Sequence, residues 1–159
     1  MPTVLVADDD ADHRELLTLA LRRFGHRVIE AADADHAERL VGAGGIDAVL
    51  LDVRMPGRSG IDVCRRLRED PANAALPVMF VTADVHENRI AAALEAGADD
   101  YLTKPFHRTE LGTRLDNLLL VRRTDRTARS AAAAMMAARH AMRRPDTDIR
   151  EPQRELRIA

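Results

Sequence analysis

Five polar side chains stand directly after short apolar runs, and their types suit the handling of a phosphoryl group. Asp8 and Asp9 end one run, Asp52 ends another, and Thr82 and Lys104 follow two more. Clustered carboxylates repel one another and attract a hard cation such as Mg²⁺, which prefers oxygen ligands. A remaining carboxylate can then attack phosphorus, while an ammonium and a hydroxyl contact the phosphoryl oxygens. For one such residue alone, a helix cap or a solvated loop charge is the simpler interpretation. That interpretation does not explain why all five occur together at strand ends.

The elements that must position these side chains follow from the hydrophobic pattern. We expect strands near residues 4–7, 28–29, 48–51, 77–81 and 101–103. We expect helices near residues 12–24, 37–42, 61–67, 87–96 and from 108 onward. Strands that are apolar throughout are typical of a parallel sheet covered on both faces. The alternation predicts a doubly wound α/β domain, in which the carboxyl ends of the strands meet at one edge.

Charge divides the chain into an acidic body and a basic tail. Residues 1–121 carry 14 Lys+Arg and 21 Asp+Glu, whereas residues 122–159 carry 10 Arg and 5 Asp+Glu. The single cysteine, Cys64, cannot form an internal disulfide, which favours a reducing compartment. No segment approaches the roughly 18 apolar residues of a membrane helix, and the N-terminus lacks the basic region of a signal peptide. We therefore expect a cytoplasmic protein with no membrane partner.

The motifs around the polar residues are specific as a set. They are residues 6–9 (VADD), 51–57 (LDVRMPG) with Gly60, 81–83 (VTA) and 104–106 (KPF). Thr82 and Lys104 lie thirty and fifty-two residues after Asp52. In motifs and separations, roughly residues 1–121 resemble the receiver domain of bacterial response regulators, and the chain resembles the stand-alone type.

This resemblance implies a flavodoxin-like fold with helices on both faces of a five-stranded parallel sheet of order 2-1-3-4-5. It also implies a role for each matching residue. These roles are Asp52 as phosphoacceptor; Asp8, Asp9, Asp52 and the backbone carbonyl of Arg54 as Mg²⁺ ligands; Lys104 and Thr82 as phosphoryl contact and switch hydroxyl; and Tyr101 as the aromatic that moves with Thr82.

The function that follows from the resemblance is two-component signalling by a phosphoprotein, not turnover by an enzyme. A histidine kinase would phosphorylate Asp52 with Mg²⁺, and the product would act on an unidentified output protein. Two alternatives stay open: a phosphorelay intermediate that passes the group to a histidine phosphotransferase, and the N-terminal receiver of a longer regulator. A homodimer could form through the fourth helix, fifth strand and last helix. A small aspartate-nucleophile phosphatase fits poorly, because the first strand lacks an Asp-x-Asp-x-Thr arrangement.

Several further side chains receive an expectation of their own. Arg54 and Asp84 occupy positions that vary in the family and tune the lifetime of the phosphorylated form. Their opposite charges either pair across the mouth of the site and hinder the hydrolytic water, or remain two solvated loop charges. Asp10 is expected to cap the first helix. We expect Cys64 in the core and all six histidines at the surface.

The tail, residues 122–159, lacks the character of a known output domain. Small and flexible side chains at helical spacing predict a helix to about residue 143, with disorder after Pro145. This segment could be a frayed, solvated helix, or it could be a helix that binds a partner protein or forms a dimer with a second copy of the chain. Specific DNA binding is not expected, because an arginine-rich stripe alone gives only salt-sensitive affinity.

Overall fold

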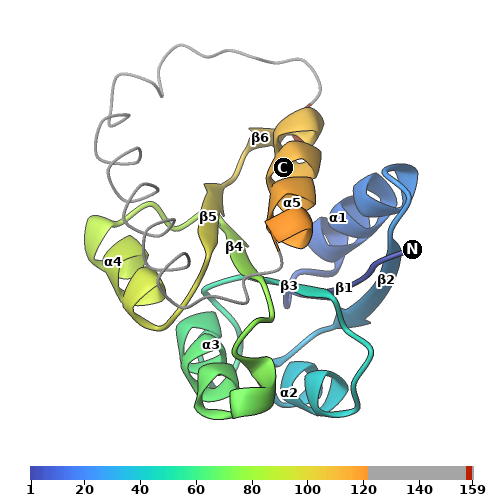
Figure 1. Ribbon diagram of the computed structural model, residues 1–159. Coiled ribbons are helices and arrows are strands. Elements are labelled where there is room, and N and C mark those ends of the chain that lie inside the picture. Colours follow the sequence, from blue (N-terminus) through green and yellow to red (C-terminus); the bar gives the residue numbers. More distant parts are fainter. Residues whose placement is uncertain (122–156, 159) are drawn as a thin grey trace.

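A five-stranded parallel sheet forms the centre of the protein in this computed structural model, which describes residues 1–121 and 157–158 (Figure 1). The strands are β1 (Thr3–Ala7), β2 (Arg27–Ala31), β3 (Ala48–Leu51), β4 (Val78–Thr82) and β5 (Asp100–Thr103). Their order is β2-β1-β3-β4-β5, and every pair is parallel. The predicted flavodoxin-like sheet is confirmed.

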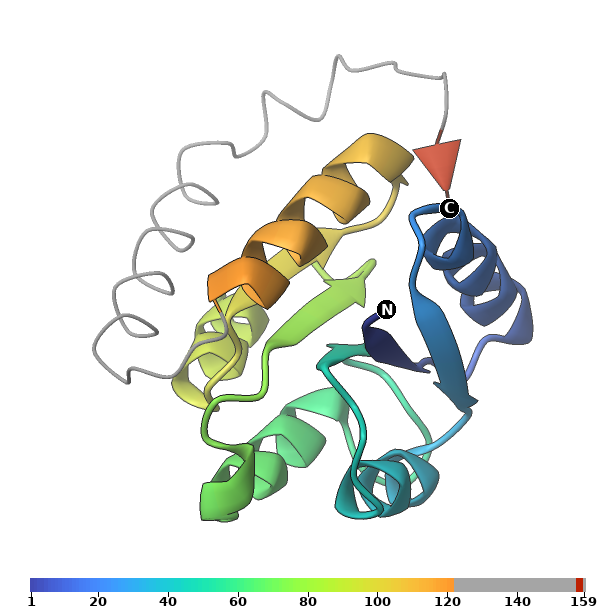
Figure 2. The same cartoon turned by 45° about the vertical axis from the view of Figure 1, so that its right-hand side comes forward.

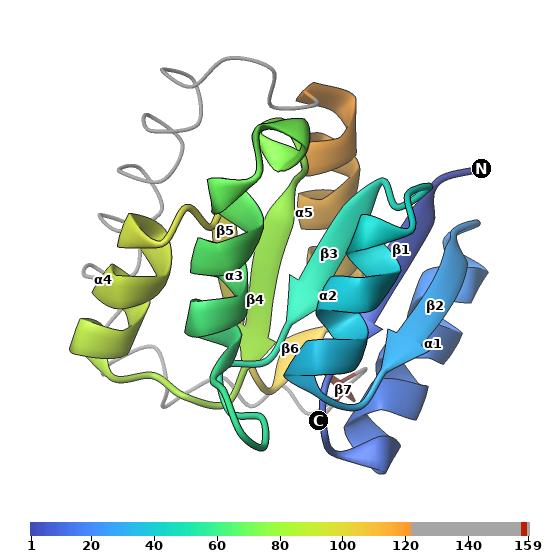
Figure 3. The same cartoon turned by 90° about the horizontal axis from the view of Figure 1, so that it is seen from below.

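Helices cover both faces of this sheet. The helices are α1 (Ala11–Arg23), α2 (Ala34–Gly42), α3 (Gly60–Glu69), α4 (Glu87–Glu95) and α5 (Arg108–Val121), with a short 3-10 turn η1 (Pro71–Asn73). Seen from below, α2, α3 and α4 lie on one side of the sheet, whereas α1 and α5 lie on the other (Figure 3). The turned view shows α5 lying along the sheet (Figure 2). Among the described residues, none of these helices is long and apolar enough to cross a membrane.

Two hydrophobic clusters pack on the two faces, which explains why the strands are apolar throughout. In β1, Leu5 and Ala7 join the cluster beneath α2, α3 and α4, while Val4 and Val6 join the cluster beneath α1 and α5. Successive side chains of a strand point to opposite faces, so a sheet with two covered faces needs apolar residues at every position. Edge strand β2 is exposed or half-buried over most of its length. Its apolar pattern is therefore weaker, and the strand predicted at residues 28–29 is shorter than the observed Arg27–Ala31.

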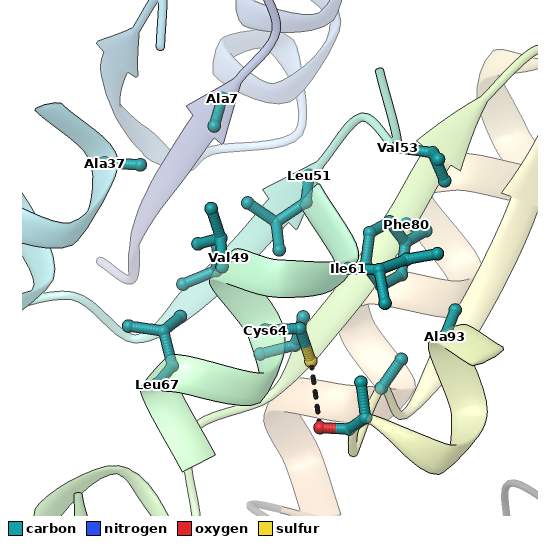
Figure 4. Close-up of a cluster of buried hydrophobic side chains, with 14 of the residues drawn as sticks. Ala7, Ala37, Val49, Leu51, Val53, Ile61, Cys64, Leu67, Phe80 and Ala93 are labelled. Carbon is teal, nitrogen blue, oxygen red and sulfur yellow. Dashed lines mark hydrogen bonds between the residues drawn. The ribbon is translucent and has the colours of Figure 1, made fainter. Parts of the chain in front are cut away.

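The cluster beneath α3 contains the single cysteine (Figure 4). Cys64 is fully buried, and its Sγ lies 3.5 Å from the carbonyl oxygen of Ala96. Ile61 and Leu67 flank it on the same helix face and are buried as well. The prediction that Cys64 belongs to the core is confirmed.

Side-chain caps fix where the helices begin after the strands. The Asp10 carboxylate accepts hydrogen bonds from the backbone N–H groups of Asp12 at 2.9 Å and His13 at 3.2 Å. Asp33 caps α2 and Ser59 caps α3 in the same way. These caps satisfy N–H groups that a first helical turn otherwise leaves unpaired. Asp10 is thus the cap that the sequence predicted.

The structure differs from two expectations. His26 is buried rather than at the surface, because it lies between the end of α1 and α5, with its Nε2 3.5 Å from the Asp116 carboxylate. A short strand β7 (Arg157–Ile158) pairs antiparallel with β6 (Phe106–His107), where disorder was expected. The remaining expectations for the tail, including its helix to about residue 143, lie outside the described residues.

Gly60 offers a test of the contact between α3 and the loop that carries Asp52. A Cβ on Gly60 would overlap the Asp52 carbonyl oxygen and would lie 3.0 Å from the Phe80 ring. We expect Gly60→Ala to lower the free energy of unfolding by more than about 2 kcal/mol, because the backbone around Asp52 must shift. Urea unfolding measures this change.

Gly42 provides the matched control at the last residue of α2. A Cβ there meets no atom within 4 Å, so Gly42→Ala should leave stability unchanged or raise it by a few tenths of a kcal/mol, up to about 1 kcal/mol. Equal unfolding midpoints for the two variants would contradict the close approach at Gly60.

Candidate phosphoacceptor site

The Lys104 ammonium lies between two carboxylates at the carboxyl-terminal edge of the sheet. Its Nζ is 2.9 Å from Asp8 Oδ2 and 3.3 Å from Asp52 Oδ2. The Lys104 and Asp8 side chains are only 6% and 1% exposed. Three residues that follow three different strands therefore form one partly buried ion cluster, as the sequence predicted from their positions at strand ends.

Backbone hydrogen bonds join each of the three loops to the last residue of a neighbouring strand. The backbone N–H of Asp52 donates to the Ala7 carbonyl at 3.0 Å, and that of Lys104 donates to the Thr82 carbonyl at 2.8 Å. The N–H of Asp8 donates to the Ala31 carbonyl of β2 at 3.1 Å. The site is thus built on extensions of the sheet rather than on independent loops.

Both oxygens of Asp52 have hydrogen-bond donors. Its Oδ1 accepts from the Thr82 hydroxyl at 2.8 Å and from the backbone N–H of Arg54 at 3.1 Å. Its Oδ2 faces Lys104. These donors orient the carboxylate and balance its charge.

Asp8 is a buried carboxylate whose charge is only partly balanced. Burial raises the pKa of Asp8 above its ordinary value, and the neighbouring charge of Asp52 raises it further. Hydrogen bonds from the backbone N–H of Asp10 and from Lys104 act in the opposite direction. One ammonium thus serves two carboxylates, so the cluster attracts a further cation.

Asp9 lies at the exposed side of this cluster. It lines a shallow surface hollow together with Arg54, Met55, Ser59 and other residues. The carboxylates of Asp8, Asp9 and Asp52 and the carbonyl of Arg54 are hard oxygen donors, and this donor set fits Mg²⁺. Within residues 1–121, however, no three acidic, histidine or cysteine side chains already stand close enough to hold a metal ion. The assignment of these four ligands stays a prediction.

Thr82 and Tyr101, the predicted switch residues, are connected through Asp84. Tyr101 is fully buried, and its hydroxyl donates to the Asp84 carbonyl at 2.6 Å. The backbone N–H of Asp84 donates to the Thr82 hydroxyl oxygen at 3.3 Å. Burial raises the pKa of the Tyr101 hydroxyl, with further contributions from the charges of Asp84 and Asp52. The Thr82 hydroxyl, which lies beside the predicted phosphoacceptor, and the Tyr101 hydroxyl on β5 are therefore both hydrogen-bonded to the backbone of Asp84.

Arg54 and Asp84 approach each other at the mouth of the site. The Arg54 Nε lies 3.8 Å from Asp84 Oδ2; the arginine side chain is 72% exposed, whereas that of the aspartate is fully buried. Burial acts to raise the pKa of Asp84, but hydrogen bonds from the ring and backbone N–H of His86 hold it below its ordinary value. Asp84 is therefore an anion with two basic neighbours, Arg54 and His86. The pairing of Arg54 with Asp84 that the sequence suggested is present as a long contact.

Two residues of α1 reach the site without having been identified from the sequence. His13 Nδ1 lies 3.2 Å from Lys104 Nζ. Arg14 donates to the Asp8 carbonyl at 2.7 Å and contacts Glu30 of β2 at 3.0 Å. The one available signal was that both stand in the first turn of a helix that begins directly after Asp8 and Asp9.

Comparison with known proteins agrees with this geometry. Residues 4–116 match the family model of the response regulator receiver domain. The chain is 40% identical over 117 residues to the phosphate regulon transcriptional regulatory protein PhoB of Pseudomonas aeruginosa, covering 74% of this chain and 51% of PhoB. It is 38% identical over 157 residues to the transcriptional regulatory protein TcrA of Mycobacterium tuberculosis, covering 98% of this chain and 61% of TcrA. The chain thus spans about half to three fifths of the length of these relatives.

A solved structure is similar in both fold and sequence. The response regulator TrrA of Thermotoga maritima, in complex with Mg²⁺–BeF, superposes with a TM-score of 0.68 at 31% identity, covering 74% of this chain and 99% of TrrA. We did not expect specific DNA binding from the sequence. The names of PhoB and TcrA conflict with this expectation, because both are transcriptional regulators. The family match, which covers most of the chain and every predicted site residue, shows that this protein belongs to the response regulator receiver domain family of two-component systems.

Proposed function

We propose that this protein is a phosphorylation switch in which Asp52 accepts a phosphoryl group from a histidine kinase in a Mg²⁺-dependent reaction. The single observation that carries the proposal is the Asp52 carboxylate, held by Thr82 and Lys104 beside the buried Asp8. Membership of the receiver family supports the same reaction. The cytoplasmic location predicted from the sequence accords with a kinase as donor.

The residues of the chain have distinct tasks in this transfer. An Asp52 oxygen forms the new bond to phosphorus while the bond from phosphorus to the donor's histidine nitrogen breaks. Mg²⁺, when bound by the predicted ligands, supplies positive charge to the phosphoryl oxygens. Lys104 supplies a second cation on the other side, and for this its ammonium must exchange a carboxylate for a phosphoryl oxygen.

The response to phosphorylation would begin at Thr82. Its hydroxyl now donates to Asp52 and would instead donate to a phosphoryl oxygen. This movement disturbs the hydrogen bond that the hydroxyl oxygen accepts from Asp84, whose carbonyl holds Tyr101. The equilibrium between two arrangements of α4, β5 and α5 would then shift, and this face would bind an output partner or a second copy.

The source of the output is a separate question. A stand-alone regulator that acts on another protein stays our prediction, as does a relay to a histidine phosphotransferase. The receiver of a longer, DNA-binding regulator is a second candidate, favoured because the relatives are transcriptional regulators of which this chain spans only part. A pull-down with and without beryllofluoride, on full-length and tail-deleted protein, distinguishes partners that bind the body from those that bind the tail.

Removal of the phosphoacceptor tests the central assignment. We expect wild-type protein to gain label from acetyl phosphate only with Mg²⁺, and Asp52→Asn to gain none, because an amide oxygen is a poor nucleophile. Intact mass spectrometry detects the adduct. Asp62→Asn, at an exposed carboxylate of α3, should label like the wild type; stable label on Asp52→Asn would contradict the assignment.

Asp8→Asn tests the charge imbalance at the proposed metal site. Because burial raises its folded-state pKa, the ionised Asp8 destabilises the fold at neutral pH. This penalty shrinks as the pH falls through the folded-state pKa and is gone below the lower pKa of the unfolded chain. Without metal, Asp8→Asn should raise the free energy of unfolding at pH 7, and the gain should shrink as the pH falls and the Asp8 carboxyl of the wild type takes up its proton. Thermal or urea unfolding measures both effects.

Mg²⁺ should reverse this ranking. The metal stabilises only the protein that binds it, so wild-type protein should gain stability with Mg²⁺ and Asp8→Asn should gain far less. Glu15→Gln, at an exposed carboxylate of α1, is the control and should respond to Mg²⁺ as the wild type does. A metal-free Asp8→Asn protein less stable than wild type at pH 7 would show that the contact with Lys104 outweighs the cost of burial.

The pair between Arg54 and Asp84 makes a prediction about phosphate loss. If Arg54 restricts the approach of the hydrolytic water, Arg54→Ala should lose phosphate roughly threefold faster than wild type, a modest factor because the arginine is largely exposed. Loss is followed after removal of the phosphodonor. Arg65→Ala, which removes another exposed arginine and its pair with Asp62 on α3, should not differ from wild type, and an unchanged rate in Arg54→Ala would refute the idea.

A further inference from the structure

His13 is the third neighbour of the Lys104 ammonium, after the two carboxylates. The Lys104 Nζ lies 2.9 Å from Asp8, 3.3 Å from Asp52 and 3.2 Å from His13 Nδ1. An ammonium has three N–H donors and no acceptor. The Nδ1 atom must therefore accept, which places the proton of the neutral imidazole on Nε2.

A carboxylate approaches the same imidazole atom from the helix cap. Asp10 Oδ2 lies 3.6 Å from His13 Nδ1. The hydrogen bond from the His13 backbone N–H is the main reason why the pKa of Asp10 lies below its ordinary value, so Asp10 stays an anion near neutral pH. A carboxylate attracts Nδ1 only when that atom carries a proton. The Lys104 ammonium, which follows β5, and the Asp10 carboxylate of the cap thus approach the same ring nitrogen with opposite charges.

His13 also differs from the other two partners of Lys104 in its part in the reaction. Asp52 becomes the phosphorylated residue, and Asp8 is a predicted metal ligand, so both are diverted from the ammonium when phosphoryl group and metal arrive. The Nδ1 atom of His13 remains available throughout. Among the three described side chains that contact the ammonium, it is the one able to keep it at the mouth of the site during the transfer.

We propose that His13 is a positioning residue for Lys104. In the neutral form, the imidazole accepts a hydrogen bond from the ammonium and directs it toward the incoming phosphoryl group. In the protonated form, the ring turns to Asp10 and repels the ammonium, so that phosphorylation slows. This inference rests on the proposed function, and it adds a residue from α1 to the reaction.

Two substitutions separate the acceptor role of His13 from its charge. His13→Asn places an amide oxygen near the position of Nδ1, so the acceptor is kept, whereas the titratable group is removed. His13→Leu keeps an apolar volume and removes the acceptor. His36→Asn is the matched control, because His36 lies on α2, which covers the opposite face of the sheet.

The experiment measures the initial rate of phosphorylation of the full chain by acetyl phosphate with Mg²⁺, between about pH 5.5 and about pH 8, the range in which an imidazole changes its charge. Intact mass spectrometry gives the adduct. The chain has one tyrosine and no tryptophan, so its tyrosine emission reports on Tyr101 beside Asp84 in the same samples. Circular dichroism at each pH verifies that every variant is folded.

We expect the rate of wild type relative to His13→Asn to fall by about threefold to tenfold from high to low pH, the factor that corresponds to the net contribution of one ordinary hydrogen bond. His13→Leu should be slower than wild type by a similar factor at high pH, with no such step. His36→Asn should follow wild type throughout. If His13→Leu does not fold, the comparison of wild type with His13→Asn decides alone.

Contrary results are equally clear. A ratio of wild type to His13→Asn that is constant with pH, or that rises toward low pH because an imidazolium attracts the phosphodonor, would overturn the positioning role. A folded His13→Leu with the wild-type rate at high pH would overturn it as well. Absence of Asp52-dependent label on the wild type at every pH would instead overturn the proposed function.

Discussion

The Lys104 ammonium between Asp8 and Asp52 is the interaction on which the rest of the site depends. Two carboxylates delivered by different strands repel each other in a partly buried cluster. One lysine, 96 residues from Asp8 in sequence, makes their proximity tolerable without a metal. The same ammonium is then available to a phosphoryl group. The charge that stabilises the resting site is therefore the charge that the proposed reaction uses.

The sheet explains why such distant residues meet. Parallel strands with both faces covered carry apolar side chains at every position, so polar residues appear only where a strand ends. Asp8, Asp52, Thr82 and Lys104 occupy such ends or lie directly beyond them. Their loops stay close because backbone hydrogen bonds continue across the ends of neighbouring strands. Burial and backbone pairing thus bring the strand ends together, and the Lys104 ammonium then balances the carboxylates that meet there.

The proposed coupling from the site to the surface would pass through a short polar segment rather than through the apolar core. Thr82 contacts both Asp52 and Asp84, and the Asp84 carbonyl accepts from Tyr101. Arg54 and His86 contact different oxygens of the Asp84 carboxylate. Hydrogen bonds of this kind have discrete alternatives, whereas packed cores deform little. That difference favours a switch at β4 and β5.

The order and type of the main elements, the Asp10 cap, the burial of Cys64 and the residues gathered around Asp52 could all be predicted from the amino-acid sequence. Each of these follows from local periodicity or from the rule that strand ends meet at one edge. The contact of His13 with Lys104, the bond from Arg14 to Asp8 and the burial of His26 could not be predicted in this way. These depend on how α1 packs against the sheet and α5. His13 and Lys104 are 91 residues apart, and no local pattern encodes the distance between their side chains.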